Sequence, residues 1–222
     1  MKLDVPVIGI LRGVDPPFFP EIMATSFASG LQAIEVTMNT VGALEMISAA
    51  RASVPAGHFL GMGTIRNLRE AEQAVAAGAM FLVSPNCDLE VIAYANRHSV
   101  PIIAGALTPT EVYAAWAAGA MMVKVFPCSA FGPGYIKELR GPFDQIPLVA
   151  VGGVTEQNVG DYLAAGAQAV GVGTTLFGKE ALRQRNLRQL GDNVKKFIAC
   201  AETPSGHNAN KGEEECIDQK LK

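Results

Sequence analysis

Short runs rich in β-branched residues alternate along this chain with alanine-rich helical segments, and this alternation restricts the fold more than any other feature. The runs are "VPVIGILR", "AIEVTMNT", "HFLGMGTI", "MFLVSP", "PIIAGAL", "MMVKVFP", "PLVAVGG" and "AVGVGT". Segments between them, such as "NLREAEQAVAAG", "DLEVIAYANRHS", "TPTEVYAAWAAG" and "TEQNVGDYLAAG", repeat apolar residues at helical spacing. They begin with Asn, Asp or Thr, which can cap a helix, and usually end at a glycine suited to a C-cap.

The string "AAGA" recurs at 76–79, 117–120 and 164–167, each time between a predicted helix and the next predicted strand. The repeating unit is therefore strand, turn, helix and glycine turn. Eight parallel strands buried on both faces favour a closed (β/α)8 TIM barrel, which we expect to occupy residues 1–202 as a single domain. A doubly wound open sheet is the alternative, although it normally has fewer strands.

Composition and net charge limit the classes of partner that the chain can bind. The chain has 222 residues, of which 49% are hydrophobic and 18% are charged, so it can bury one large core. A net charge of -3 gives no basic field to attract nucleic acid or an anionic membrane. No apolar stretch approaches the roughly 18 residues of a spanning helix, and no secretory pattern is seen. We expect a cytoplasmic protein with a small-molecule partner.

Cysteine and histidine spacing gives no sign of a metal site. The four cysteines form no CxxC pair and the three histidines never stand at ligand spacing, so we expect reduced thiols and no bound metal. After residue 202 the sequence turns polar and includes an acidic run, with almost nothing to bury. We therefore expect residues 203–222 to form a disordered tail, although such a tail can also dock on a neighbouring subunit.

Charged residues occur at only three positions of the predicted strands: Arg12, Glu35 and Lys124. Strand alternation places Glu35, Thr37 and Asn39 on one face of the second strand. Reacting groups of such barrels stand at the carboxyl ends of the strands. If these faces point inward, the carboxylate of Glu35 and the amine of Lys124 share one apolar cavity.

The simplest interpretation of Glu35 and Lys124 is a buried ion pair, in which each partner compensates part of the other's burial cost. A catalytic interpretation is favoured because burial lowers the pKa of a lysine toward the range where its amine is a nucleophile. The carboxylate alone would raise that pKa, so desolvation and the nearby Arg12 must dominate. A neutral amine beside a carboxylate suits Schiff-base chemistry on a ketone, with Glu35 transferring the protons.

The last two predicted strands run into glycine-rich turns, "AVGGVT" and "GVGTTLFG". Backbone N–H groups at such turns, which open helices, form the usual phosphate site of these barrels. Glycines required only for tight turns are the alternative. We expect a phosphate to bind at Gly152, Gly153, Gly173 and Thr174.

Several motifs together resemble the class I aldolases that cleave 2-keto-3-deoxy-6-phospho sugar acids, the KDPG/KHG aldolase family. They are "ILRG", "IEVTMNT", "GMGTI", "SPN", "VKVFPCSAFGP" and "VGGV" followed by "GVGT", between about Val5 and Leu182. The resemblance implies reversible cleavage to pyruvate and glyceraldehyde 3-phosphate by a homotrimer, without a metal or organic cofactor.

The resemblance also assigns roles to single residues. Lys124 would be the Schiff-base residue and Glu35 the general acid/base. Arg12 and Thr64 would hold the carboxylate of the pyruvate half. Pro85 and Phe126 would pack against the pyruvyl group. The phosphate would be held by Gly152, Gly153 and Thr174.

Three positions depart from the phosphogluconate branch of the family and resemble the phosphogalactonate branch: Asn39, Asn86 and Val151. The two substrates differ in configuration at C4, which a hydroxyl-bearing side chain such as Thr can discriminate. We therefore favour the galacto substrate. Asn39 stands where the phosphogluconate branch has an Arg, which leaves Arg12 as the only obvious cation for the carboxylate.

Three alternatives remain open from the sequence. A 4-hydroxy-2-oxoglutarate aldolase would use the same chemistry on a shorter substrate without phosphate. A phosphosugar isomerase or epimerase would use Glu35 as a base and would need no buried lysine. A non-catalytic sugar-phosphate binding barrel would keep the glycine turns while Glu35 and Lys124 became dispensable.

Overall fold

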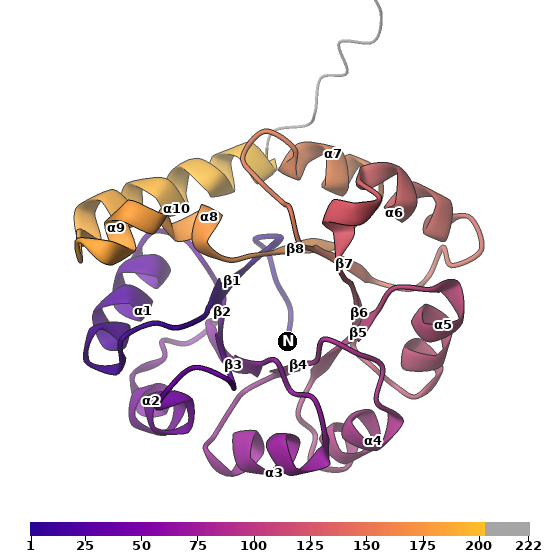
Figure 1. The fold of residues 1–222 in the computed structure, drawn as a ribbon, viewed down its shortest axis with the longest axis horizontal. Coiled ribbons are helices and arrows are strands. Elements are labelled where there is room, and N and C mark those ends of the chain that lie inside the picture. The colour runs from indigo at the N-terminus through magenta and orange to yellow at the C-terminus, as the bar shows by residue number, and fades with distance from the viewer. Residues whose placement is uncertain (203–222) are drawn as a thin grey trace, which may run out of the picture.

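The polypeptide forms a closed barrel of eight parallel strands surrounded by helices (Figure 1), as seen in a computed structural model that describes residues 1–202. Each strand pairs with its neighbours in chain order, and β8 closes the ring on β1. The (β/α)8 prediction is confirmed, and the open-sheet alternative is wrong. The strands are β1 Val7–Leu11, β2 Ala33–Thr37, β3 Phe59–Gly63, β4 Leu82–Val83, β5 Ile102–Ala106, β6 Met122–Val125, β7 Leu148–Val151 and β8 Ala169–Val172.

The helices form an outer ring around these strands (Figure 1). Three of the predicted cap residues do cap their helices: the side chains of Asn67, Asp88 and Thr108 each accept a backbone N–H of the first turn. The helices are α1 Phe19–Ala28, α2 Ala43–Ala50, α3 Leu68–Ala76, α4 Leu89–Arg97, α5 Pro109–Ala117, α6 Pro133–Arg140, α7 Val159–Ala164, α8 Thr174–Phe177, α9 Lys179–Arg183 and α10 Leu187–Glu202, with short 3₁₀ turns η1 Pro16–Phe18, η2 Arg51–Ser53 and η3 Cys128–Ala130.

The helix predicted from Thr155 begins later than its sequence suggests. Helix α7 starts at Val159, because Thr155 and Asn158 form a turn in which the side-chain oxygen of Asn158 accepts the Thr155 N–H at 2.7 Å. Strand β4 is likewise shorter than the run "MFLVSP" and has only two residues in the ladder. Both differences lie at the ends of elements, where local side-chain hydrogen bonds compete with regular structure.

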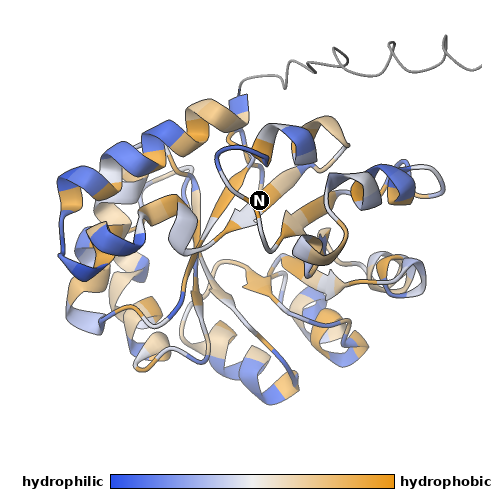
Figure 2. Ribbon diagram, turned by 45° about the horizontal axis from the view of Figure 1, so that its top comes forward, coloured by the Kyte–Doolittle hydropathy of each residue, from blue (hydrophilic) through white to orange (hydrophobic). Residues whose placement is uncertain are grey.

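Apolar side chains form two cores on the two sides of the strand ring. The larger core lies between strands and helices, where the helices turn their hydrophobic side inward (Figure 2). The smaller core fills the barrel interior and is built from alternate strand positions. Its buried members are Ile8, Ala33, Phe81, Val83, Ile103, Met122, Val149, Val151 and Ala169.

The N-terminal segment closes one end of the barrel. Met1 and Leu3 pack against the interior core, and the chain terminus appears at the centre of the ring in Figure 1. The side-chain oxygen of Gln32 accepts the N–H groups of Asp4 and Val5 at 2.7 and 2.9 Å, which fixes this segment to the start of β2. With the amino ends of the strands covered, an accessible site is left to the opposite, carboxyl end.

The tail predicted for residues 203–222 lies outside the described residues. Within residues 1–202, no helix is long and apolar enough to cross a membrane.

Candidate active site

A cavity of about 470 Å³ opens at the carboxyl ends of the strands. It brings together residues from strands or strand ends distributed around the whole barrel. The predicted site residues that line it are Arg12, Glu35, Thr64, Pro85, Lys124, Phe126, Val151, Gly152, Gly153, Gly173 and Thr174.

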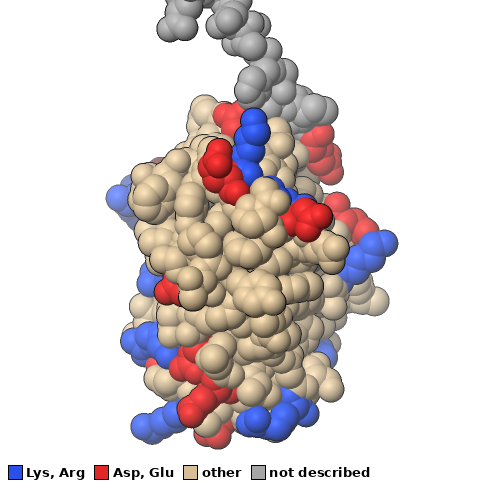
Figure 3. All heavy atoms as spheres, turned by 90° about the vertical axis from the view of Figure 1, so that its right-hand side faces the viewer, with Lys and Arg blue, Asp and Glu red and all other residues tan. Residues whose placement is uncertain are grey.

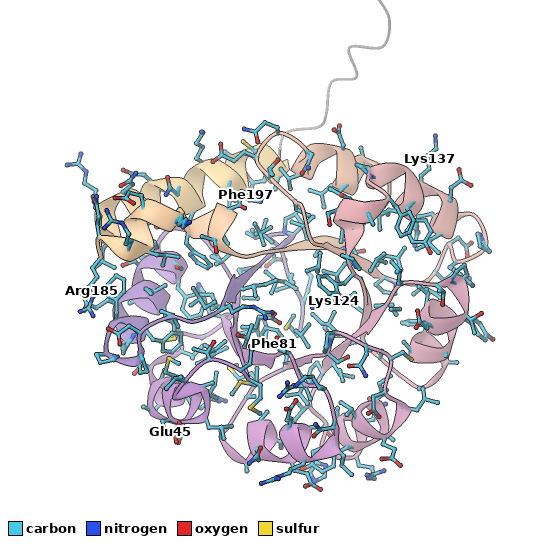
Figure 4. All side chains as sticks on the ribbon, in the orientation of Figure 1. Glu45, Phe81, Lys124, Lys137, Arg185 and Phe197 are labelled. Atoms are coloured by element: carbon cyan, nitrogen blue, oxygen red, sulfur yellow. The ribbon has the colours of Figure 1, made fainter. Side chains whose placement is uncertain are left out.

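Lys124 projects into the barrel from the middle of β6. It shares a face with Met122 of the interior core, and its backbone pairs with Gly105 on β5 and Val149 on β7. Only 7% of the residue is exposed, and Figure 4 shows it within the ring of strands. Its Nζ lies 4.9 Å from the centre of the Phe126 ring, a contact that favours the ammonium form.

Glu35 enters the same interior from β2, two residues after the core residue Ala33, and is 2% exposed. Its Oε2 atom has no hydrogen-bond partner, although buried polar atoms are normally paired. Gly63 of β3 makes room for the carboxyl group, because a Cβ at that position would lie 2.4 Å from Glu35 Cδ. Glu35 lines the cavity, and its carboxyl group holds one buried oxygen that no protein group satisfies.

Burial has the largest effect on the pKa values of Glu35 and Lys124, and neighbouring charges have a smaller one. Burial raises the pKa of Glu35 to about 7, against the opposing effects of Lys124 and Arg12. Burial likewise lowers the pKa of Lys124, Arg12 lowers it further, and Glu35 partly restores it. Desolvation thus exceeds the effect of the carboxylate on the pKa of Lys124, as a nucleophilic amine requires.

Glu35 and Lys124 do not form a close ion pair. No nitrogen to oxygen distance of 4.0 Å or less joins them within residues 1–202, where the ion pairs involve exposed side chains such as Arg183 and Arg185. The two groups nevertheless influence each other's pKa.

Arg12 and Thr64 stand together on one side of the cavity mouth. The Arg12 Nη2 donates to Thr64 Oγ1 at 3.3 Å. Thr64 adopts a left-handed backbone conformation with φ of 59°, which is uncommon for a residue other than glycine and is often found at functional sites. This guanidinium and hydroxyl offer donors for one carboxylate.

The turns after β7 and β8 build a further part of the cavity wall, and β8 lies next to β1 in the barrel. Gly152 and Gly153 have φ of 100° and 74°, so this turn requires glycine at both positions. The hydroxyl-bearing residues Thr155, Thr174 and Thr175 line the same part of the cavity. Helix α8 has only four residues. The hydrogen-bond donors of this wall are therefore mainly the backbone N–H groups of the turn and the threonine hydroxyls.

Residues 5–192 of the chain match the family described as KDPG and KHG aldolase. The chain belongs to this family. The aldolase is 35% identical over 189 residues to the probable 2-dehydro-3-deoxy-6-phosphogalactonate aldolase of Rhizobium meliloti (strain 1021), covering 84% of this chain and 88% of that one. The resemblance predicted from the motifs is confirmed, and with it the enzyme class, an aldehyde-lyase.

Two solved structures have the same fold as the aldolase. A structure described as native KDPGal has a TM-score of 0.84 at 29% identity and covers 90% of this chain and 96% of that one. The KDPG aldolase of Legionella pneumophila, with pyruvate captured as a covalent carbinolamine intermediate, has a TM-score of 0.80 at 25% identity and covers 86% and 93%.

Asn39 is the one predicted site residue that does not line the cavity. It is exposed in the loop after β2. Conversely, the cavity of the aldolase includes residues that the sequence argument passed over, among them Ile10, Thr155 and Thr175. Ile10 lies two residues before Arg12 on the same face of β1, so strand alternation alone was a usable signal for it.

The described part of the aldolase contains no group of three or more His, Cys, Asp or Glu residues arranged to hold a metal ion. Cys87, Cys128 and Cys200 are free thiols, whereas Cys216 lies beyond residue 202. Burial raises the pKa of the Cys128 thiol to about 11, so this cysteine is not a nucleophile near neutral pH.

Proposed function

We propose that the protein reversibly cleaves a 2-keto-3-deoxy-6-phospho sugar acid to pyruvate and glyceraldehyde 3-phosphate through a Schiff base on Lys124. The observation that carries this proposal is a buried amine with a lowered pKa facing a carboxyl group whose pKa burial raises to about 7. An amine of this kind is a nucleophile, and a carboxyl group that titrates near neutral pH can both donate and accept a proton.

Each step uses one of these two groups. The Lys124 amine adds to the C2 ketone to give a carbinolamine, which loses water to form an iminium ion when Glu35 supplies the proton. Glu35, as carboxylate, then removes the proton of the C4 hydroxyl. The C3–C4 bond breaks, its electron pair moves into the iminium to give an enamine, and the aldehyde departs. Protonation at C3 and addition of water release pyruvate and free the amine.

The two charged ends of the substrate fit two sets of donors that line the cavity. Arg12 and Thr64 hold the carboxylate next to C2, close to the amine. The glycine turn at 152–153 and the hydroxyl of Thr174 hold the phosphate at the far end. A dianionic phosphate at this wall gives the phosphorylated substrate an advantage over 4-hydroxy-2-oxoglutarate, which has no phosphate to place there.

We expect the galacto epimer at C4 to be preferred, because Val151 presents an apolar side chain where a threonine would present a hydroxyl. Val151 is 6% exposed and lines the cavity at the end of β7. Val151→Thr should lower the ratio of kcat/KM for the galacto over the gluco substrate by about tenfold. The measurement is pyruvate release from each pure epimer. A wild-type preference for the gluco epimer, or a ratio that the substitution leaves unchanged, would contradict this assignment.

The same assay tests the proposed function itself. Release of pyruvate from either phosphorylated epimer supports it. Release only from 4-hydroxy-2-oxoglutarate would move the assignment to the shorter substrate. Interconversion of phosphosugars without pyruvate would favour a non-covalent isomerase, and binding without turnover would favour a sugar-phosphate binding barrel.

A homotrimer is part of the proposal, and the surface around α5 supports self-association. Figure 3 views the side of the barrel that carries α4, α5 and α6, and uncharged residues cover most of its middle. Tyr113 and Trp116 of α5 are 59% and 37% exposed, and Tyr113 stacks on Phe143 at 6.2 Å. The only charged residue of α5, Glu111, caps its own helix. Exposed aromatic surface without charge is typical of subunit interfaces.

We expect light scattering of the purified protein to give the mass of three chains, and Trp116→Glu to shift it toward one chain because a charge would be buried in the interface. Tyr94→Phe, on the neighbouring helix α4, is the control for a mild aromatic change. A monomeric wild-type protein, or a trimer that tolerates Trp116→Glu, would overturn the assignment of this surface.

A phosphorylated substrate and free thiols are consistent with the proposed cytoplasmic location.

A further inference from the structure

Two buried hydroxyl groups connect the end of β2 to the loop that follows β1. Thr37 ends β2 and is fully buried, and Thr40 in the next loop is 5% exposed. Their Oγ1 atoms lie 2.9 Å apart, and Thr40 Oγ1 also accepts the backbone N–H of Gly13 at 2.9 Å. These three hydrogen-bonding groups form a chain that runs from one strand end to the neighbouring one.

Thr40 is a rigid anchor for this chain. Its own N–H donates to the Thr37 carbonyl at 2.8 Å, and its carbonyl accepts the Ala43 N–H at 3.1 Å where α2 begins. Gly13, in contrast, has little packing to hold it. A Cβ built on Gly13 would have no atom within 4 Å, and its φ of 65° is left-handed. The bond to Thr40 therefore fixes a turn that packing leaves free.

The turn matters because Arg12 is the residue next to Gly13. The Arg12 side chain is exposed and long, and its guanidinium makes one side-chain hydrogen bond within residues 1–202, to Thr64 at 3.3 Å. Where that guanidinium stands over the cavity thus depends on the backbone at residues 12–13. A shift of this turn would move the cation away from both Glu35 and Lys124, whose pKa values it lowers.

We infer that Thr37 and Thr40 are positioning residues that hold Arg12 over the carboxylate end of the substrate. This inference rests on the proposed function, in which Arg12 binds the carboxylate of pyruvate or of the keto acid. A purely structural role is the competing explanation, since losing any buried hydrogen bond lowers stability. A positioning role predicts a change mainly in the KM for pyruvate, whereas a purely structural role predicts similar changes in the KM values of both substrates.

The test is the aldol addition of pyruvate to glyceraldehyde 3-phosphate, measured with each substrate varied. Thr40→Val removes the acceptor for the Gly13 N–H with little change of shape. It should raise the KM for pyruvate about tenfold, the usual scale for one lost hydrogen bond near a charge, and change the KM for the aldehyde less than about twofold. Thr40→Ser, which restores the hydroxyl, should recover most of the loss.

Three further variants keep the outcome interpretable. Ser26→Ala removes another fully buried hydroxyl, one that donates to the Ile22 carbonyl within α1 at 2.7 Å, and should leave both KM values unchanged. Thr37→Val keeps the bond between Gly13 and Thr40 but frees the Thr40 hydroxyl, so a smaller rise in the pyruvate KM is expected. It also serves as the second route if Thr40→Val does not fold.

The third variant, Arg12→Ala, shows whether Thr40 acts through Arg12. If it does, adding Thr40→Val to Arg12→Ala should raise the pyruvate KM no further. An unchanged pyruvate KM in Thr40→Val, equal rises for both substrates, or full additivity with Arg12→Ala would overturn the inference. Failure of the proposed function would be seen separately, because the wild-type protein would then not consume pyruvate at all.

Discussion

Replacing Lys124 with methionine is expected to lower the rate of substrate cleavage by at least about 10⁴-fold, a loss of more than about 5 kcal/mol of transition-state stabilisation. Without the amine no iminium forms, and the C3–C4 bond has no electron sink when it breaks. The measurement is pyruvate release at saturating substrate.

The barrel should stay folded in this variant, because methionine fills a similar volume in an apolar interior. Glu35 would lose the ammonium that lowers its pKa, and its pKa would rise above about 7, so the carboxyl group would stay protonated and neutral. Lys137→Met is the matched control, since Lys137 lies at the outer surface on α6 (Figure 4). A Lys124→Met variant that is folded and retains more than a few per cent of the wild-type rate would contradict the covalent role.

Glu35→Gln is expected to slow cleavage by about 100-fold or more, the usual contribution of a positioned general acid/base. It should also change the pH profile. In the proposed mechanism the carboxylate is the base, and burial raises its pKa to about 7, so kcat/KM of the wild-type protein should fall as the pH drops below about 7. In Glu35→Gln this limb near pH 7 should disappear.

The limb that remains in Glu35→Gln should belong to Lys124 and should lie at lower pH than in the wild-type protein. Glu35 raises the pKa of Lys124, so removing its charge lowers that pKa further and keeps the amine neutral in more acidic solution. Glu45→Gln, on the outer helix α2, is the control for a glutamate remote from the cavity (Figure 4). An unchanged pH profile, or a rate near that of the wild-type protein, would assign proton transfer to another group.

The fold and the two buried charged residues of the candidate site were predictable from the sequence for a simple physical reason. Eight strands buried on both faces leave few positions where a charge is tolerated, so a charge within a strand stands out. Glu35 and Lys124 were identified by this rule, but strand alternation showed only which residues share a strand face, and the structure shows that both side chains lie inside the barrel. The motifs around them then indicated the family.

Features that depend on how distant segments pack were not predictable from local patterns. Gly63 reads as an ordinary strand glycine, yet its missing side chain provides the space for the Glu35 carboxyl group. Met1 and Leu3 close the barrel from a segment outside every repeat. Asn39 shares the alternation of Glu35 but lies beyond the end of β2, where the chain has left the strand and the rule no longer applies.

The covalent role of Lys124 is tested most directly by incubating the protein with pyruvate and borohydride, followed by intact-mass measurement and peptide mapping. Borohydride reduces an iminium to a stable amine, so the account predicts a single reduced pyruvyl adduct, located on Lys124 and absent from Lys124→Met. An adduct on a different lysine, or no adduct on the folded wild-type protein, would contradict it.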